Sequence, residues 1–217
     1  MSVNPIVYFI FSIVGTIAFA ISGAIVGIRR NMDVFGVCVL GATTACGGGI
    51  IRDIIIGIVP TSLINPIYVG VSIVISLIVF FIMYFFHDSI SKSKYTNIYD
   101  NIIMAMDSVG LGVFTVMGVQ TGIAAGFIEN TFLLVFLGTI TGVCGGLLRD
   151  MMASKTPYIF SEDIYAGASI LGAISCVYLH KYFGEVVALL LATTVVVFIR
   201  YLAKRLNLNL LRIKISS

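Results

Sequence analysis

A six-residue stretch that occurs twice decides the fold of this chain. Residues 48–53 read Gly-Gly-Ile-Ile-Arg-Asp, and residues 145–150, which lie 97 positions further on, read Gly-Gly-Leu-Leu-Arg-Asp. Glycines also recur upstream of each stretch: the four-residue glycine spacing in residues 15–27 is found again in residues 110–122. Matching marks in the same order along the chain indicate an internal duplication.

The composition predicts that both copies lie in a membrane. Of the 217 residues, 59% are hydrophobic and only 11% are charged, and the mean hydropathy is +1.10. A soluble domain carries about 25% charged residues, so this chain has too little polar surface to be a soluble enzyme or a disordered chain. The net charge of +3 is too small to favour nucleic acid as a partner. We therefore predict an integral membrane protein whose partner is the lipid bilayer.

The apolar residues fall into seven runs, which polar or proline-containing segments separate. A membrane-spanning helix needs about 20 residues, and each run is close to that length. The prediction is an all-α polytopic membrane protein with seven transmembrane helices. The runs cover residues 6–28, 34–58, 66–86, 101–122, 131–152, 163–180 and 185–203.

Lysine and arginine residues predict the orientation, because cytoplasmic loops of membrane proteins carry an excess of them. With the N-terminus outside and seven crossings, nine basic residues fall on the cytoplasmic side and only Lys181 falls outside. We expect Arg200 to extend to the cytoplasmic surface as well. The predicted location is the cell (plasma) membrane, with a cytoplasmic C-terminus. The nine residues are Arg29, Arg30, Lys92, Lys94, Lys155, Lys204, Arg205, Arg212 and Lys214.

Each copy of the duplication holds three predicted helices. Because three is an odd number, the second copy enters the membrane from the opposite side, and the two repeats are inverted. Inverted repeats are an architecture of transport proteins, whose pathway runs near the midplane between the repeats. The predicted units are a first three-helix repeat at 1–90, a second, inverted repeat at 91–182, and a seventh helix with a basic tail at 183–217.

The duplicated stretch combines helix-weakening glycines with buried charge. Glycine costs about 1 kcal/mol relative to alanine in a helix, and adjacent glycines permit a kink or a short unwound stretch. A charged side chain inside a membrane costs about 2.5–3.5 kcal/mol, so it is expected to face the bundle interior or a wet path. We interpret the element as part of an ion pathway; close packing with a structural ion pair is the alternative. The predicted kinks are Gly47, Gly48, Gly49, Gly145 and Gly146, and the charged pore or gate elements are Arg52, Asp53, Arg149 and Asp150.

Three further polar residues are candidates near this element. Thr44 and Thr141 precede the glycines by about one turn, where they either line a polar path or bond back to their own helix. Asp107 either reaches into the pathway from the cytoplasmic side or pairs with Arg149. The four-residue glycine spacing in 15–27 and 110–122 favours close helix packing.

No pattern in the sequence indicates catalysis or a metal. There is no Ser-His-Asp motif, Walker loop or HExxH motif. The four cysteines form no CxxC pair and lie in apolar stretches, where a free thiol behaves as a small hydrophobic side chain. We therefore predict a protein that is not an enzyme, with no catalytic residue, no metal site and no cofactor.

The duplicated three-helix unit, with Gly-Gly-x-x-Arg-Asp in each copy and a seventh helix, resembles the prokaryotic TRIC (trimeric intracellular cation) channel family. The same domain also carries the label of a glycine transporter. The resemblance covers the chain from about residue 9 to about residue 204. It implies symmetric homotrimers with a separate pore in each protomer, beside the helices at 34–58 and 131–152, which kink at their glycines. It also implies permeation of potassium and other monovalent cations. The Lys-Glu-Val motif of the animal channels is absent, so their phosphoinositide binding is not transferred.

Two functions remain open at this point. The first is a channel that passes monovalent cations, chiefly potassium. The second is a secondary transporter for a small solute such as glycine, in which Arg52 would hold the carboxylate and Asp53 the amine. Inverted repeats and broken helices suit both. A purely structural membrane scaffold is disfavoured, because duplicated buried charge is costly.

Overall fold

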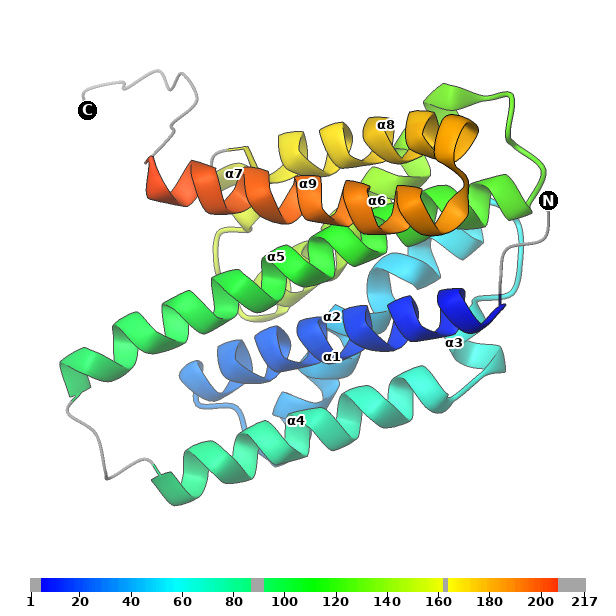
Figure 1. Ribbon diagram of the computed structural model, residues 1–217. Coiled ribbons are helices and arrows are strands. Elements are labelled where there is room, and N and C mark those ends of the chain that lie inside the picture. The colour runs from blue at the N-terminus through cyan, green and yellow to red at the C-terminus, as the bar shows by residue number, and fades with distance from the viewer. Residues whose placement is uncertain (1–4, 87–91, 162–163, 207–217) are drawn as a thin grey trace, which may run out of the picture.

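The computed structural model describes residues 5–86, 92–161 and 164–206, without the side chains of residues 86, 92–97 and 161. Every regular element in these ranges is an α-helix, which confirms the all-α prediction (Figure 1). The orientation predictions for Lys92, Lys94, Arg212 and Lys214 rest on side chains outside the described part. The helices are α1 (Pro5–Arg29), α2 (Val34–Ile55), α3 (Thr61–Ile64), α4 (Ile67–Phe86), α5 (Lys92–Ala124), α6 (Thr131–Met152), α7 (Tyr158–Ser161), α8 (Tyr165–Phe183) and α9 (Glu185–Arg205).

Six helices of the described chain are long and apolar enough to cross a membrane: α1, α2, α4, α5, α6 and α9. The protein is therefore a multi-pass membrane protein, as the composition predicts. The predicted run at 163–180 corresponds to α8, whose last turn carries His180 and Lys181 and lowers its apolar character. Figure 1 shows α8 lying alongside α9. The seventh crossing stays a prediction.

The two helices that carry the repeated stretch, α2 and α6, have matching capping residues at their starts and matching left-handed residues after their ends. Asp33 caps the start of α2, where its side chain accepts a hydrogen bond from Gly36 N–H, and Asn130, 97 positions later, accepts one from Leu133 N–H at the start of α6. A left-handed residue follows each helix two positions after its end, Gly57 after α2 and Ser154 after α6, again 97 positions apart. The duplication therefore extends to the local chemistry that sets the helix bounds.

The helices form two groups that pack against each other. The first group is α1, α2 and α4, and the second is α5, α6 and α8, on which α9 packs. Contacts of α1 with α5 and of α2 with α6 join the groups. In Figure 1, α1 and α5 run in opposite directions, and the short helices α3 and α7 lie at opposite ends of the bundle. The start of α1 and the end of α9 also lie at opposite ends.

The glycine stripes bring neighbouring helices into close contact, in agreement with the packing interpretation. A Cβ atom on Gly23 of α1 would lie 2.9 Å from the Cα of Gly41 on α2. The equivalent pair in the second group, Gly118 and Gly138, would be separated by 2.8 Å. Contacts this short require hydrogen in place of a side chain, so these glycines set the separation of α1 from α2 and of α5 from α6.

The duplicated glycines also allow close contact between α2 and α6. A Cβ on Gly48 would overlap the carbonyl oxygen of Thr141, and one on Gly145 would overlap the carbonyl oxygen of Thr44. Helical residues continue without a break through 47–49 and through 145–146. The unwound stretch that adjacent glycines permit is therefore not formed, because α2 and α6 support each other across the crossing. Bends of the helix axes stay a prediction.

Candidate functional site

Arg52 and Asp53 form a buried ion pair near the end of α2. Nε of Arg52 donates to Oδ1 of Asp53 at 2.8 Å, and Nη2 lies 2.7 Å from the same oxygen. Oδ2 of Asp53 accepts hydrogen bonds from the N–H and the hydroxyl of Thr61, at 2.8 and 3.0 Å. Thr61 begins α3, so the pair ties this short helix to α2. Both carboxylate oxygens of Asp53 are thus engaged inside the protein, where only 1% of its side chain is exposed.

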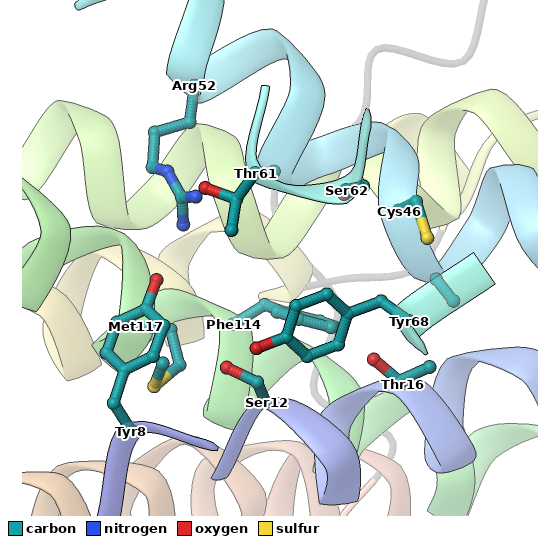
Figure 2. A pocket seen from close by; sticks show the side chains of 12 residues that line it. Tyr8, Ser12, Thr16, Cys46, Arg52, Thr61, Ser62, Tyr68, Phe114 and Met117 are labelled. Carbon is teal, nitrogen blue, oxygen red and sulfur yellow. The ribbon is translucent and has the colours of Figure 1, made fainter. Parts of the chain in front are cut away.

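Arg52 faces a cavity of about 40 Å³, part of it open to the outside, which is formed by α1, α2, α3, α4 and α5. Figure 2 shows the guanidinium of Arg52 and the hydroxyl of Tyr8 pointing toward one another. No aspartate or glutamate is among the described residues that line the cavity, and no residue of α6 lines it. Arg52 is thus the ionised side chain on its wall. The hydroxyl groups on the wall come from Tyr8, Ser12, Thr16, Thr61, Ser62 and Tyr68.

The second Arg-Asp pair lies in a closed environment. Nε of Arg149 donates to Oδ1 of Asp150 at 2.9 Å, and Oδ2 of Asp150 accepts from Tyr158 N–H at 3.0 Å. In addition, Nη1 of Arg149 donates to Asp107 at 2.6 Å and to the hydroxyl of Ser22 at 2.5 Å. The side chain of Arg149 has no exposed surface. Asp107 was expected either to reach into the pathway or to pair with Arg149, and the structure shows the pair with Arg149.

The duplication shows why one arginine faces a cavity and the other does not. The residue 95 positions before Asp107 is Ser12, and the residue 95 positions after Ser22 is Met117. Both Ser12 and Met117 line the cavity at Arg52. At the two places where Arg149 finds a carboxylate and a hydroxyl, Arg52 therefore has a short hydroxyl and a thioether.

Two larger side chains close the second site further. Leu111 stands where the first copy has Thr16, and Tyr158 stands where it has Thr61. Leu111 is fully buried. The ring of Tyr158 lies 5.0 Å from Cζ of Arg149 and 4.1 Å from the ammonium nitrogen of Lys155, so it contacts both cations.

The prediction that Arg200 extends to the cytoplasmic surface is wrong. Arg200 is 3% exposed, with Cζ 4.7 Å above the ring of Tyr165. Helix α9 therefore brings a second buried guanidinium to the second group. Within the described chain, several buried polar atoms here have no hydrogen-bond partner, and such atoms are commonly met by internal water. They are the hydroxyl of Tyr165, Oδ2 of Asp107, Nη2 of Arg149, and Nε and Nη2 of Arg200.

The remaining predicted site residues fall into two groups. Thr44 and Thr141 donate to the carbonyl oxygens of their own helices, at 2.6 and 2.5 Å, and neither lines the cavity. Gly47 packs toward the side chain of Leu148. Gly49 lines the cavity, and the nearest atom to an added Cβ is Nη2 of Arg52 at 3.8 Å. Among the predicted glycines of the first copy, Gly49 is thus the one that faces open space.

Gly146 is the equivalent of Gly49, but its surroundings are occupied. An added Cβ would lie 2.7 Å from the hydroxyl of Tyr165 and 3.4 Å from Asp107. Sequence reasoning did not single out Tyr165, Ser22 or Tyr158 as members of this site. The signal for Tyr165 was present, since Tyr68 and Tyr165 lie 97 positions apart within a matching Ile-Tyr-x-Gly pattern.

Taken together, the fold and the site define a helical multi-pass membrane protein with duplicated, buried Arg-Asp pairs. The sequence model of a family described as Glycine transporter matches residues 9–84 and 104–181. The chain belongs to this family, the TRIC family, as the sequence predicted. A UPF0126 membrane protein of Deinococcus radiodurans is 32% identical over 196 residues, which cover 89% of this chain and 86% of the relative.

Two solved structures share the fold over nearly their whole length. A TRIC trimeric intracellular cation channel orthologue from Rhodobacter sphaeroides superposes with a TM-score of 0.82 at 29% identity, covering 93% of this chain and 99% of its own. A prokaryotic TRIC channel crystallised in 0.5 M KCl gives a TM-score of 0.84 at 30% identity, covering 95% of this chain and 100% of its own.

Proposed function

We propose that this protein is a channel that passes monovalent cations, chiefly potassium, through a pathway in each protomer of a homotrimer. The observation that carries the proposal is the likeness of nearly the whole chain, at about 30% identity, to solved structures of TRIC cation channels. Such a channel performs no catalysis and needs no cofactor. Its partners are the lipid bilayer and the permeating cation.

We propose that the protein lies in the plasma membrane with seven crossings. Its N-terminus is outside and its C-terminus is in the cytoplasm. Residues 1–90 and 91–182 are two inverted three-helix repeats, and residues 183–217 add the seventh helix and tail. The opposite directions of α1 and α5 and the opposite positions of α3 and α7 support the inversion (Figure 1). The opposite positions of the two described chain ends support an odd number of crossings.

The proposed pathway runs beside α2 and α6 and passes the two Arg-Asp pairs in turn. In the inverted topology the hydroxyl-lined cavity at Arg52 is the vestibule on the outer side. The site at Arg149 lies toward the cytoplasm, where Asp107 and Ser22 hold the arginine in a closed arrangement. We infer that conduction requires Arg149 to leave these partners, because a guanidinium with no exposed surface leaves no room for a continuous wet path at this point.

A carrier for glycine is the second candidate, and the family description favours it. A zwitterion needs a carboxylate of the protein for its ammonium group as well as a cation for its carboxylate. Asp53 would be that carboxylate, but its two oxygens already accept hydrogen bonds from Arg52 and Thr61. The cavity offers no other acidic side chain among the described residues, so we place the channel first.

One pair of measurements separates the two candidates. Purified protein is reconstituted in a planar bilayer with a potassium gradient, and a parallel preparation in proteoliposomes is tested for glycine uptake. We expect discrete single-channel steps that reverse at the potassium equilibrium potential. Saturable glycine uptake without unitary currents would refute the channel and support the carrier.

A further inference from the structure

We propose that the cavity at Arg52 is a binding site for one small monovalent anion, a halide or a short carboxylate. The anion lies on the edge of the Arg52 guanidinium that Asp53 leaves free. This proposal concerns binding in the cavity and does not rest on cation permeation.

The first argument is the unused donor of Arg52. Nε and Nη2 both point to Oδ1 of Asp53. Within the described chain no residue accepts a hydrogen bond from Nη1. Because Arg52 is only 4% exposed, bulk water does not solvate this edge freely, and a guanidinium N–H is a strong donor that favours a charged acceptor.

The second argument comes from the other copy of the duplication. At the equivalent arginine, Nη1 of Arg149 holds the carboxylate of Asp107 at 2.6 Å, so an anionic group occupies the corresponding place. In the first copy that position is Ser12, which lines the cavity. A free anion in the cavity therefore takes the place beside Arg52 that a side-chain carboxylate takes beside Arg149.

The third argument is the charge and hydrogen-bonding character of the wall. Arg52 is the ionised group there, and hydroxyl groups such as those of Tyr8, Thr16 and Tyr68 can turn to donate to an anion. Asp53 does not line the cavity. The site thus provides donors for one negative charge and no partner for an ammonium group, which favours a simple anion over a zwitterion.

The test uses the whole protein in detergent and compares two variants at one position. Ser12→Asp places the carboxylate of the second copy beside Arg52, whereas Ser12→Ala keeps the space open. The melting temperature is measured in potassium chloride and in potassium acetate, each titrated against a bulky sulfonate at constant ionic strength. General salt effects act alike on both variants, so their difference reports the site.

We expect the wild type and Ser12→Ala to show a saturable rise in Tm of roughly 2–4 °C, because a ligand stabilises the state that binds it. Ser12→Asp should show no saturable rise, since its own carboxylate fills the site. Thr16→Leu, which copies Leu111, is a second, uncharged way to fill the cavity and should also lose the rise. It keeps the test decisive if Ser12→Asp does not fold.

The two anions distinguish the ligand. A rise with chloride alone assigns a halide, and a rise with acetate alone assigns a carboxylate. Equal responses in wild type and both filled variants would overturn the site, as would a response to glycine with none to chloride or acetate. Because the readout is thermal stability, failure here leaves the bilayer test of the channel unaffected, and the reverse also holds.

Discussion

The two Arg-Asp pairs of this protein share their hydrogen-bonding frame and differ in what faces the arginine. In each copy the arginine donates from Nε to the next aspartate, and that aspartate accepts an N–H from the start of a short helix, α3 or α7. Arg52 faces a hydroxyl-lined cavity, whereas Arg149 is buried against Asp107 and Ser22. A few residue differences between the two matching stretches accompany one open site and one closed site.

The physical reason lies in the cost of burying charge. A guanidinium without water needs further partners, and Arg149 has a second carboxylate in Asp107. Arg52 has one carboxylate and keeps contact with a cavity that can hold water or an anion. Substitutions at the two sites and at the helix crossing between them test this difference.

The largest effect is expected for Asp107→Ala. It leaves the buried guanidinium of Arg149 with one carboxylate, and breaking a buried ion pair costs about 3–5 kcal/mol. The free energy of unfolding should fall by this amount, measured by denaturant titration in mixed micelles. The matched control is Ser12→Ala at the equivalent position, where we expect less than about 1 kcal/mol. Similar losses in both variants would contradict the difference between the sites.

The next effect is expected at the helix crossing. Gly48→Ala places a methyl group against the backbone carbonyl of Thr141, and overpacking of this kind costs about 1–3 kcal/mol or more. The neighbouring change Gly49→Ala meets no atom closer than 3.8 Å and should be neutral or slightly stabilising, because alanine favours the helix. Thermal unfolding of both variants measures this. Comparable destabilisation by Gly49→Ala would show that the cavity wall is as tightly packed as the crossing.

A smaller loss of stability is expected for Arg52→Ala, because Asp53 keeps its two hydrogen bonds from Thr61 and water from the cavity can enter the space that the guanidinium leaves. Loss of hydrogen bonds to a charged group costs about 1–3 kcal/mol. Potassium flux in proteoliposomes should change more than the yield of trimer in size-exclusion chromatography. If flux and trimer yield fell together, the residue would have a structural role only.

The smallest effect is expected for Thr44→Val and Thr141→Val. Each hydroxyl bonds to a carbonyl of its own helix that is already part of the helical ladder, so its loss should cost less than about 1 kcal/mol. Neither residue lines the cavity, and single-channel conductance should stay within about twofold of the wild type, which corresponds to a change in barrier of well under 1 kcal/mol. A large change in conductance would mean that these hydroxyls turn toward the pathway.

Much of the arrangement around these sites follows from the sequence. The family, the all-α class and the position of the duplicated charges were all predictable, because hydropathy and the repeat are read directly from residue order. The burial of Arg200 was not predictable. A basic residue near a helix end normally extends to the interface, and only the packing of α9 on α8 places it over Tyr165.

The sequence by itself determined that this is a helical membrane protein in which an Arg-Asp pair occurs twice, at matching places of a repeated stretch. It could not determine which pair is sealed. That depends on whether Asp107 and Ser22 reach Arg149 and whether Ser12 and Met117 leave space at Arg52, which are contacts between helices far apart in the chain. Only the packing of α6 against α5 and α1, and of α2 against α1 and α5, brings these side chains together, because an ion pair is made by distance in space and not by separation in sequence.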